Sequence, residues 1–373
     1  MSTQAAIEAP QSVLTLKAIR TRHAQSEILD TDCLADDESY DNLHRMLDVD
    51  GSDTESSTCS IFSESGEADD HSNLQDNSSP SCTQAEAVIS QEPISRYHVI
   101  SELCRSLFGT VVLALDTTSN QEVAIKLSNT DLVQAGISST GCTVMEDPLF
   151  ETSLLRRLPS HPCIVSLQRE HVIKNVHWAV LEYVPNGDLF EHLLQHGLLQ
   201  QRVAQIYVHQ IAQALLHMHS HGVCHLDVSL ENILLDANYN LKLTDFGVAR
   251  IFGQSESSVF PGITGRNKPG KLRYMAPEML AGQDFDGCLV DSFALGVVMF
   301  CLLTGSAPFE AARADDPRWC LLASGDFDAF FAFVDVSIPD INAVDLLKSL
   351  LTTADKRISI AAVLQHPWFS QDA

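Results

Sequence analysis

The stretch that decides the fold reads HLDVSLEN and runs from His225 to Asn232. An amphipathic helix pattern at residues 200–220 precedes it, and the apolar run ILL at residues 233–235 follows it. The stretch is therefore predicted to be a loop between a helix and a strand. Asp227 and Asn232 lie five residues apart on this loop. Such a loop offers a carboxylate that can accept a proton from an attacking hydroxyl and an amide oxygen that can bind a divalent cation.

Three further motifs surround this loop in the sequence. The strand pattern VAIK occupies residues 123–126, DFG occupies residues 245–247, and MAPE occupies residues 275–278. The four motifs, taken in this order, resemble the catalytic domain of eukaryotic protein kinases of the serine/threonine type. The resemblance extends from about Tyr97 to Phe369, which is most of the chain.

The resemblance implies an α+β, two-lobed fold, with a small antiparallel-sheet N-lobe that carries one key helix and a larger helical C-lobe. Within a domain at residues 94–373, the expected bounds are about 97–181 for the N-lobe, 182–187 for the hinge and 188–369 for the C-lobe. The implied reaction transfers the γ-phosphate of ATP, bound with Mg²⁺, to Ser or Thr of protein substrates. Such a reaction needs charge neutralisation and alignment more than covalent chemistry.

The resemblance assigns five residues to catalysis and metal binding. Lys126 is expected to contact the α- and β-phosphates while Glu151 holds it. Asn232 and Asp245 are expected to bind Mg²⁺, and Asp227 to orient and deprotonate the substrate hydroxyl. All five are present, which argues against an inactive domain.

A buried lysine needs an acidic partner, and two glutamates compete for Lys126. Glu151 is favoured because Leu155 and Leu158 follow it at helical spacing, before the HP dipeptide at residues 161–162 ends the helix. Glu146 stands before Pro148 and is expected to precede the helix.

The phosphate-covering loop departs from the family pattern. Gly109 is the only one of the usual three glycines, and Cys104 and Ser106 stand where the first two are expected. Glycine lets backbone amides approach phosphate closely, so we expect this loop to be stiffer and to hold phosphate less well. Asp188 matches the ribose-binding acid and is also a candidate helix cap. The implied nucleotide-binding residues are Leu103, Gly109, Val111, Ala124, Lys126, Leu181, Glu182, Val184, Asp188 and Leu234.

Three other positions also depart from the pattern. Leu226 replaces the arginine that normally pairs with a phosphate on the activation segment, which comprises residues 248–274. We therefore expect activity not to depend strictly on phosphorylation of the segment's hydroxyl groups at Ser255, Ser257, Ser258 and Thr264. Ser229 replaces the lysine that helps to neutralise the transferring phosphate. Lys271 stands where a threonine is usual, close to that lysine in the family. We therefore expect Lys271 to supply the missing ammonium; the alternative is that it points to solvent.

The substrate class follows from the same loop. The SLEN ending resembles serine/threonine kinases more than tyrosine kinases. Asp188 and Glu231 match positions that bind arginines in basophilic kinases, so basic sequences around the target hydroxyl are expected. A pseudokinase scaffold, favoured by the eroded phosphate loop, Leu226 and Ser229, is the alternative. A lipid or small-molecule kinase is disfavoured by the APE motif, which shapes a peptide-docking platform.

Composition limits the other function classes. The 373 residues carry a formal net charge of −26, which disfavours nucleic acid and anionic membranes as partners. The longest apolar candidate, residues 294–303, is too short to span a bilayer. Ten cysteines without paired spacing indicate reduced thiols in an intracellular protein, in the cytoplasm or the nucleus.

Residues 1–93 read as a disordered, acidic, Ser-rich region with a net charge of −15. A stretch at residues 13–29 mixes apolar and basic residues and is either a weakly helical tail or a partner-binding helix. This region is the expected site of a regulatory partner. His217, His219 and His221 resemble a metal cluster, but no acid or cysteine completes the set, and surface histidines are the favoured interpretation.

Overall fold

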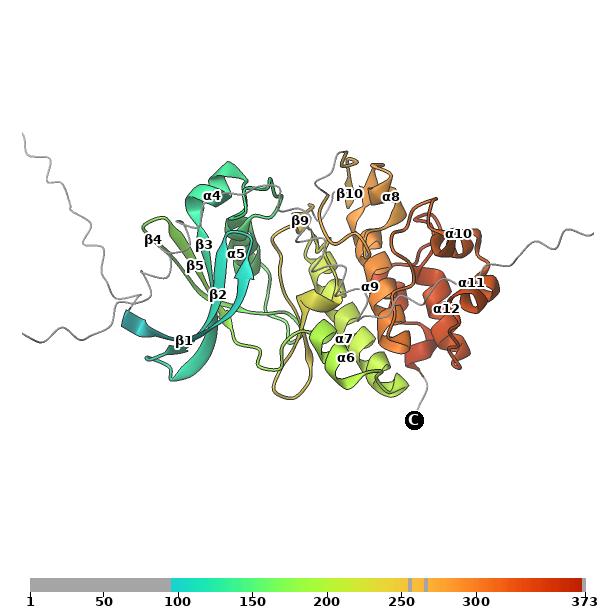
Figure 1. The fold of residues 1–373 in the computed structure, drawn as a ribbon, viewed down its shortest axis with the longest axis horizontal. Coiled ribbons are helices and arrows are strands. Elements are labelled where there is room, and N and C mark those ends of the chain that lie inside the picture. The colour runs from blue at the N-terminus through green and yellow to red at the C-terminus, as the bar shows by residue number, and fades with distance from the viewer. Residues whose placement is uncertain (1–94, 254–256, 265–267, 371–373) are drawn as a thin grey trace, which may run out of the picture.

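The structure is a computed structural model that describes residues 95–253, 257–264 and 268–370. A strand-rich lobe lies at one end and a helical lobe at the other (Figure 1). The acidic region 1–93, with its candidate helix at 13–29, lies outside the described residues. The two-lobed α+β fold expected from the sequence is confirmed.

The N-lobe is built on one antiparallel sheet of five strands in the order β1-β2-β3-β5-β4. Along the chain, two helices, α4 (Thr130–Ala135) and α5 (Pro148–Arg157), lie between β3 and β4. The strands are β1 (Tyr97–Ser106), β2 (Gly109–Asp116), β3 (Gln121–Asn129), β4 (Leu167–Ile173) and β5 (Val176–Glu182).

Strand β3 presents different chemistry on its two faces because side chains alternate along a strand. Val123, Ile125 and Leu127 are buried in the apolar core of the N-lobe. Ala124 and Lys126 point to the opposite face of the sheet. The VAIK pattern therefore anchors the strand and aims its lysine away from that core.

Helix α5 starts where its sequence provides a cap. Asp147 accepts hydrogen bonds from the amides of Leu149 and Phe150, and Pro148 occupies the first turn. The helix ends at Arg157, earlier than the HP dipeptide that we expected to end it. Pro159 explains the difference, since a residue before proline is driven out of the helical region, and Leu158 is extended with φ −73° and ψ 125°.

The C-lobe is mainly helical (Figure 1) and also contains three two-stranded sheets. Its helices are α6 (Leu189–His196), α7 (Gln201–Ser220), α8 (Pro277–Leu280), α9 (Gly287–Thr304), α10 (Pro317–Ser324), α11 (Phe327–Val334), α12 (Ile341–Leu350) and α13 (Ile360–Val363), with the 3₁₀ turns η1 (Leu230–Asn232) and η2 (Pro367–Phe369). Its strands are β6 (Val223–Cys224), β7 (Ile233–Leu235), β8 (Leu241–Leu243), β9 (Arg250–Ile251), β10 (Val259–Phe260) and β11 (Phe285–Asp286).

Most residues of helix α9 are buried inside this lobe. Among the described residues it is the one helix long and apolar enough, by length and composition alone, to cross a membrane. The apolar run expected at residues 294–303 is therefore shorter than this helix, Gly287–Thr304, which continues past the charged Asp291 at its N-terminal end. In this fold 78% of that stretch is buried, and it packs against α7 and α12.

A buried ion pair ties two distant parts of the C-lobe together. The guanidinium of Arg357 donates to both carboxylate oxygens of Glu278, over 2.6 and 3.1 Å. The Arg357 side chain is 0% exposed and that of Glu278 is 8% exposed. Removing one partner would leave the other charge buried and unpaired.

We expect Arg357→Met to lower the free energy of unfolding by about 3–5 kcal/mol, because Glu278 would keep a buried charge without its partner. Urea unfolding followed by tryptophan fluorescence measures this loss. Arg156→Met is the matched control, since the Arg156 side chain is 62% exposed although it pairs with Glu170. That variant should lose less than about 1 kcal/mol. Equal losses in the two variants would contradict this account of the pair.

Candidate active site

The loop at residues 225–232 is held in place by one buried carboxylate. Asp291 of α9 is fully buried, and its two oxygens accept hydrogen bonds from the backbone amides of His225 and Leu226, each over 2.8 Å. Leu226 adopts a left-handed conformation with φ 65°, which non-glycine residues rarely do, and its side chain is buried in the core of the C-lobe.

The two polar side chains of the loop are bonded to each other. The Asn232 amide nitrogen donates to the Asp227 carboxylate over 2.7 Å and to the Asp227 backbone oxygen over 2.9 Å. These bonds fix the rotation of the amide, so its oxygen points away from Asp227. An amide oxygen oriented in this way is suited to a hard divalent cation.

Lys126 links the strand β3, the helix α5 and the DFG segment. Its ammonium lies 2.7 Å from one oxygen of Glu151 and 3.5 Å from one oxygen of Asp245. Burial alone would lower the pKa of Lys126, but the carboxylates of Glu151 and Asp245 outweigh it and raise that pKa above its usual value. The second oxygen of Glu151 accepts a hydrogen bond from the Phe246 amide over 3.3 Å. Glu151 rather than Glu146 is therefore the partner of Lys126.

Asp245 is the second residue, after Asn232, that can hold a cation. It stands in a left-handed conformation with φ 64°. Burial would raise the pKa of Asp245, but the nearby ammonium groups of Lys126 and Lys271 lower it. The carboxylate is thereby kept charged, as a metal ligand must be.

Glu146 has a place in the site that the sequence did not predict. It precedes α5, as expected, but its Cβ and Cγ lie 3.4 and 3.3 Å from where a Cβ on Gly247 would stand. Burial and the carboxylate of Asp245 raise the pKa of Glu146 to about 7. The site thus carries an additional acidic group beside Asp227, Glu151 and Asp245. Its position depends on how residues 137–146 fold, and no local motif marks it.

Lys271 enters the site from the activation segment. Its ammonium lies 3.0 Å from the Ser229 hydroxyl, 3.3 Å from Asp227 and 3.2 Å from the amide oxygen of Asn232. Its backbone amide also donates to Asp227 over 3.0 Å. Burial opposes its charge, but Asp227 and Glu231 raise the pKa of Lys271 above its usual value. The side chain therefore faces the loop, not solvent.

Gly270 makes this approach possible and was missed in the sequence. It adopts φ +86°, and a Cβ on it would stand 2.5 Å from the Leu226 carbonyl oxygen and 3.3 Å from an Asp227 oxygen. Only glycine fits such a close backbone contact without displacement. The PGK tripeptide around it was a usable signal, since Gly directly before an inward-facing Lys marks a tight turn.

The expected adenine site has apolar walls contributed by separate segments. Leu181 and Val184 are buried together with Val165, and Ala124 and Leu234 pack against them. Val165 was not predicted, because an isolated apolar residue outside a periodic segment gives no signal. The Glu182 carboxylate is engaged by the Ser166 amide and the Lys242 ammonium, over 2.8 and 2.9 Å.

The phosphate-covering loop is a continuous β-hairpin. Leu103 on β1 is 42% exposed, and Cys104 pairs with Val111, which in turn pairs with Lys126 on β3. A Cβ on Gly109 would stand 2.2 Å from the Leu127 carbonyl oxygen. Packing between β2 and β3 is therefore enough to require this glycine, whether or not it meets phosphate.

Asp188 caps helix α6, which was one of the two roles considered for it. Its carboxylate accepts a hydrogen bond from the Glu191 amide over 2.8 Å. Burial raises the pKa of Asp188 above its usual value. Its contact with a ribose stays a prediction.

The three histidines at the end of α7 have separate partners. His217 donates to the Pro159 carbonyl, His221 lies against the carbonyl of His217, and His219 is bonded to Asp291 over 2.9 Å. No group of His, Cys, Asp and Glu suited to a metal ion occurs within residues 95–253, 257–264 and 268–370. The metal interpretation therefore finds no support there.

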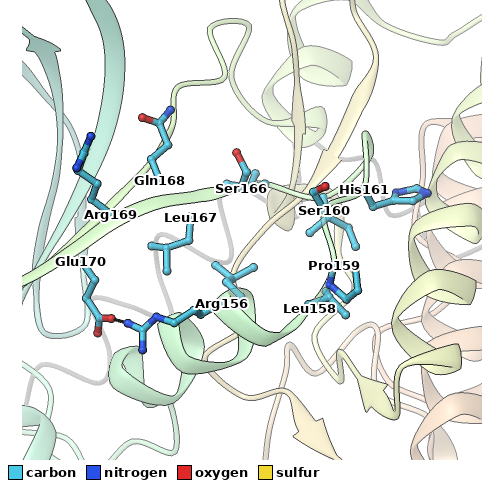
Figure 2. A pocket seen from close by; sticks show the side chains of 13 residues that line it. Arg156, Leu158, Pro159, Ser160, His161, Ser166, Leu167, Gln168, Arg169 and Glu170 are labelled. Atoms are coloured by element: carbon cyan, nitrogen blue, oxygen red, sulfur yellow. Dashed lines mark ion pairs between the residues drawn. The ribbon is translucent and has the colours of Figure 1, made fainter. Parts of the chain in front are cut away.

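A cavity of about 450 Å³ lies beside the C-terminal end of α5 (Figure 2). Its walls come from the end of α5, the turn after it and β4, and Figure 2 shows the ion pair of Arg156 with Glu170 at one edge. The candidate catalytic side chains are not among the residues that line it.

Comparison with known proteins agrees with this geometry. A family model described as "Protein kinase domain" matches residues 97–369. "Putative CBL-interacting protein kinase 27" of Oryza sativa subsp. japonica is 32% identical over 283 residues, covering 74% of this chain and 65% of that protein. "Serine/threonine-protein kinase SIK2" of Gallus gallus is 31% identical over 277 residues, covering 74% of this chain and 32% of that protein.

The match therefore spans less than two thirds of the length of these two relatives. The family model covers most of the chain and includes all four motifs. This chain belongs to the protein kinase domain family.

Proposed function

We propose that this chain is a protein-serine/threonine kinase that transfers the γ-phosphate of ATP, bound with Mg²⁺, to protein substrates. The convergence of Lys271 and Asn232 on Asp227, together with the Lys126–Glu151 ion pair, carries the proposal. The serine/threonine kinases among the relatives support it.

The donor set fits a hard cation. Asn232 offers an oriented amide oxygen, and Asp245 offers a carboxylate whose pKa is held low by Lys126 and Lys271 against the effect of burial. Mg²⁺ bound there neutralises negative charge on the phosphates. Lys126 is positioned to hold the phosphates from the side of β3.

Asp227 is suited to accept the proton of the substrate hydroxyl. Its carboxylate receives three hydrogen bonds, from Asn232, from the Lys271 backbone and from the Lys271 ammonium. An ionised carboxylate has about four acceptor sites, so one remains for a hydroxyl group. The three bonds fix the carboxylate in place and keep it ready for the transfer.

Lys271 takes the part of the lysine that is missing at position 229. Its ammonium lies against the Ser229 hydroxyl and Asp227, where positive charge stabilises a transferring phosphate. Leu226 leaves the segment without its usual phosphate-binding arginine, so the contacts of Lys271 are expected to hold the segment in its place. Phosphorylation at Ser257, Ser258 or Thr264, or at Ser255, which lies outside the described residues, is then not strictly required for activity.

Basic sequences around the target hydroxyl remain the proposed substrate context. One carboxylate oxygen of Glu231 is buried without a hydrogen-bond partner within the described residues, and a substrate arginine would supply one. The net charge of −26 favours such substrates. We further propose an intracellular location and a regulatory partner for the acidic N-terminal region.

A pseudokinase scaffold is the opposing interpretation, and the catalytic aspartate separates the two. Asp227→Asn should lower phosphate transfer from Mg-ATP to a basic Ser/Thr peptide library by about 10²–10⁴-fold, because proton acceptance is lost. ATP binding, followed by thermal shift, should be retained. The exposed Asp328→Asn is the control. Nucleotide binding without transfer by the unaltered chain would establish the scaffold instead.

Lys271→Ala should lower kcat by about tenfold or more, because the ammonium beside Asp227 is lost. The double variant Lys271→Thr with Ser229→Lys should regain most of that loss, since it returns a lysine to the catalytic loop. Lys356→Ala, at an exposed site, is the control for loss of a lysine. A kcat for Lys271→Ala within about twofold of the unaltered chain would refute the role of Lys271.

Gly270→Ala should also lower kcat, because its Cβ would displace the Leu226 carbonyl and with it the Lys271 side chain. Gly141→Ala is the matched control. It has a similar φ of +83°, but a Cβ there meets nothing within 4 Å. In both variants, backbone strain should lower the free energy of unfolding by about 1–2 kcal/mol, which thermal unfolding measures. If both keep the same kcat, the close contact at Gly270 does not position Lys271.

A further inference from the structure

Two cysteines from distant parts of the chain lie in contact beneath the candidate catalytic loop. Cys224 belongs to β6 and Cys288 to the first turn of α9, and their sulfur atoms are 3.6 Å apart. Cys224 is fully buried, and Cys288 is partly exposed. This is the one sulfur–sulfur hydrogen bond found among the seven cysteines in the described part of the chain.

The surroundings of the pair favour a thiolate on Cys288. The hydrogen bonds that Cys288 makes with the Cys224 sulfur and with His219 lower the pKa of Cys288 to about 6 against the effect of burial. Burial would also lower the pKa of His219, but its bonds to Asp291 and Cys288 raise that pKa to about 9. A thiolate is the nucleophilic form of cysteine, so Cys288 is the more reactive of the two.

The cysteine pair is connected to the candidate catalytic loop through the backbone and through Asp291. Cys224 directly precedes His225, and Cys288 lies one helical turn before Asp291. Asp291 in turn holds the amides of His225 and Leu226. A movement of Cys224 relative to α9 therefore acts on the segment that carries Asp227.

There is little free space for such a movement. A Cβ on Gly287 would stand 2.6 Å from the Cys224 sulfur and 2.9 Å from the Cys224 Cβ. The same position would meet Phe260 at 2.9 Å. The Cys224 side chain thus lies directly on the backbone of the first turn of α9, and any shift of its sulfur is transmitted to its neighbours.

We propose that Cys224 and Cys288 form a reversible disulfide under hydroperoxides, and that this bond lowers phosphate transfer by displacing the catalytic loop. The sulfur atoms must approach from 3.6 Å to about 2.05 Å. The effect on phosphate transfer rests on the proposed kinase function, whereas formation of the disulfide does not.

The chemistry balances as a two-electron oxidation. The Cys288 thiolate attacks an oxygen of the hydroperoxide, the O–O bond breaks, and a sulfenic acid forms with release of water or an alcohol. The Cys224 sulfur then attacks the Cys288 sulfur, and the S–O bond breaks. The hydroxyl group leaves with the Cys224 proton as a second molecule of water. A dithiol such as dithiothreitol reverses the reaction by exchange.

The test uses the full chain and hydrogen peroxide. After treatment, digestion without reductant and mass spectrometry should detect a peptide that links Cys224 to Cys288. We expect phosphate transfer to fall about fivefold or more and to return with dithiothreitol. Hydrogen exchange at the amides of His225 and Leu226 should rise in the oxidised chain, which reports the displaced loop without any measurement of activity.

Three variants assign the effect, each compared with its own activity before treatment. Cys288→Ser should form no linked peptide and keep its activity under peroxide. Cys320→Ser, at an exposed site, should respond like the unaltered chain. A loss of activity that persists in Cys288→Ser but disappears in Cys104→Ser would assign the sensitivity to the phosphate-covering loop and overturn the proposal.

The remaining outcomes separate this proposal from the kinase function. An active chain that forms no Cys224–Cys288 peptide, or forms it with unchanged activity and amide exchange, overturns the proposal and leaves the kinase function standing. An untreated chain without phosphate transfer argues against the kinase function. In that case, a linked peptide with faster exchange at His225 still supports the disulfide and the displacement of the loop.

Discussion

A carboxylate buried at the centre of the C-lobe holds the catalytic loop in place. Asp291 is fully buried, and a charge without partners would be costly there. The amides of His225 and Leu226 and the imidazole of His219 supply its hydrogen bonds. The left-handed backbone at Leu226 aims its amide at this carboxylate, and the next residue is Asp227. The position of the proposed proton acceptor thus depends on a group that touches neither substrate nor nucleotide.

The two lobes are joined electrostatically at Glu151. One of its oxygens binds Lys126 of the sheet, and the other accepts the Phe246 amide of the C-lobe segment. Because Asp245 also lies near Lys126, a change in the position of α5 acts on both the candidate phosphate-binding lysine and the candidate metal-binding carboxylate. A single glutamate therefore couples the helix of one lobe to the cation site of the other.

The fold could be predicted from the sequence because its decisive groups lie in short, local motifs. The partner of Lys126 was also predictable, since Glu151 is followed by a helical pattern and Glu146 is not. The position of Glu146 beside Gly247 was not, because it depends on how a segment without periodicity folds. The apolar length of α9 was underestimated, since small and polar residues in its first turns are tolerated in a buried helix. The position of Lys271 beside the catalytic loop could be predicted only because Ser229 occupies the place of the usual lysine in that loop.

The location of Lys271 has a thermodynamic consequence. A lysine within the catalytic loop is ordered once, when the domain folds, whereas Lys271 is ordered together with the activation segment that carries it. Displacing Lys271 from the site would remove the ammonium and the backbone amide that fix Asp227. The conformational entropy of the segment therefore enters the activation entropy of the reaction. The temperature dependence of the proposed reaction rate then contains a contribution from ordering Lys271 as well as one from the chemical step.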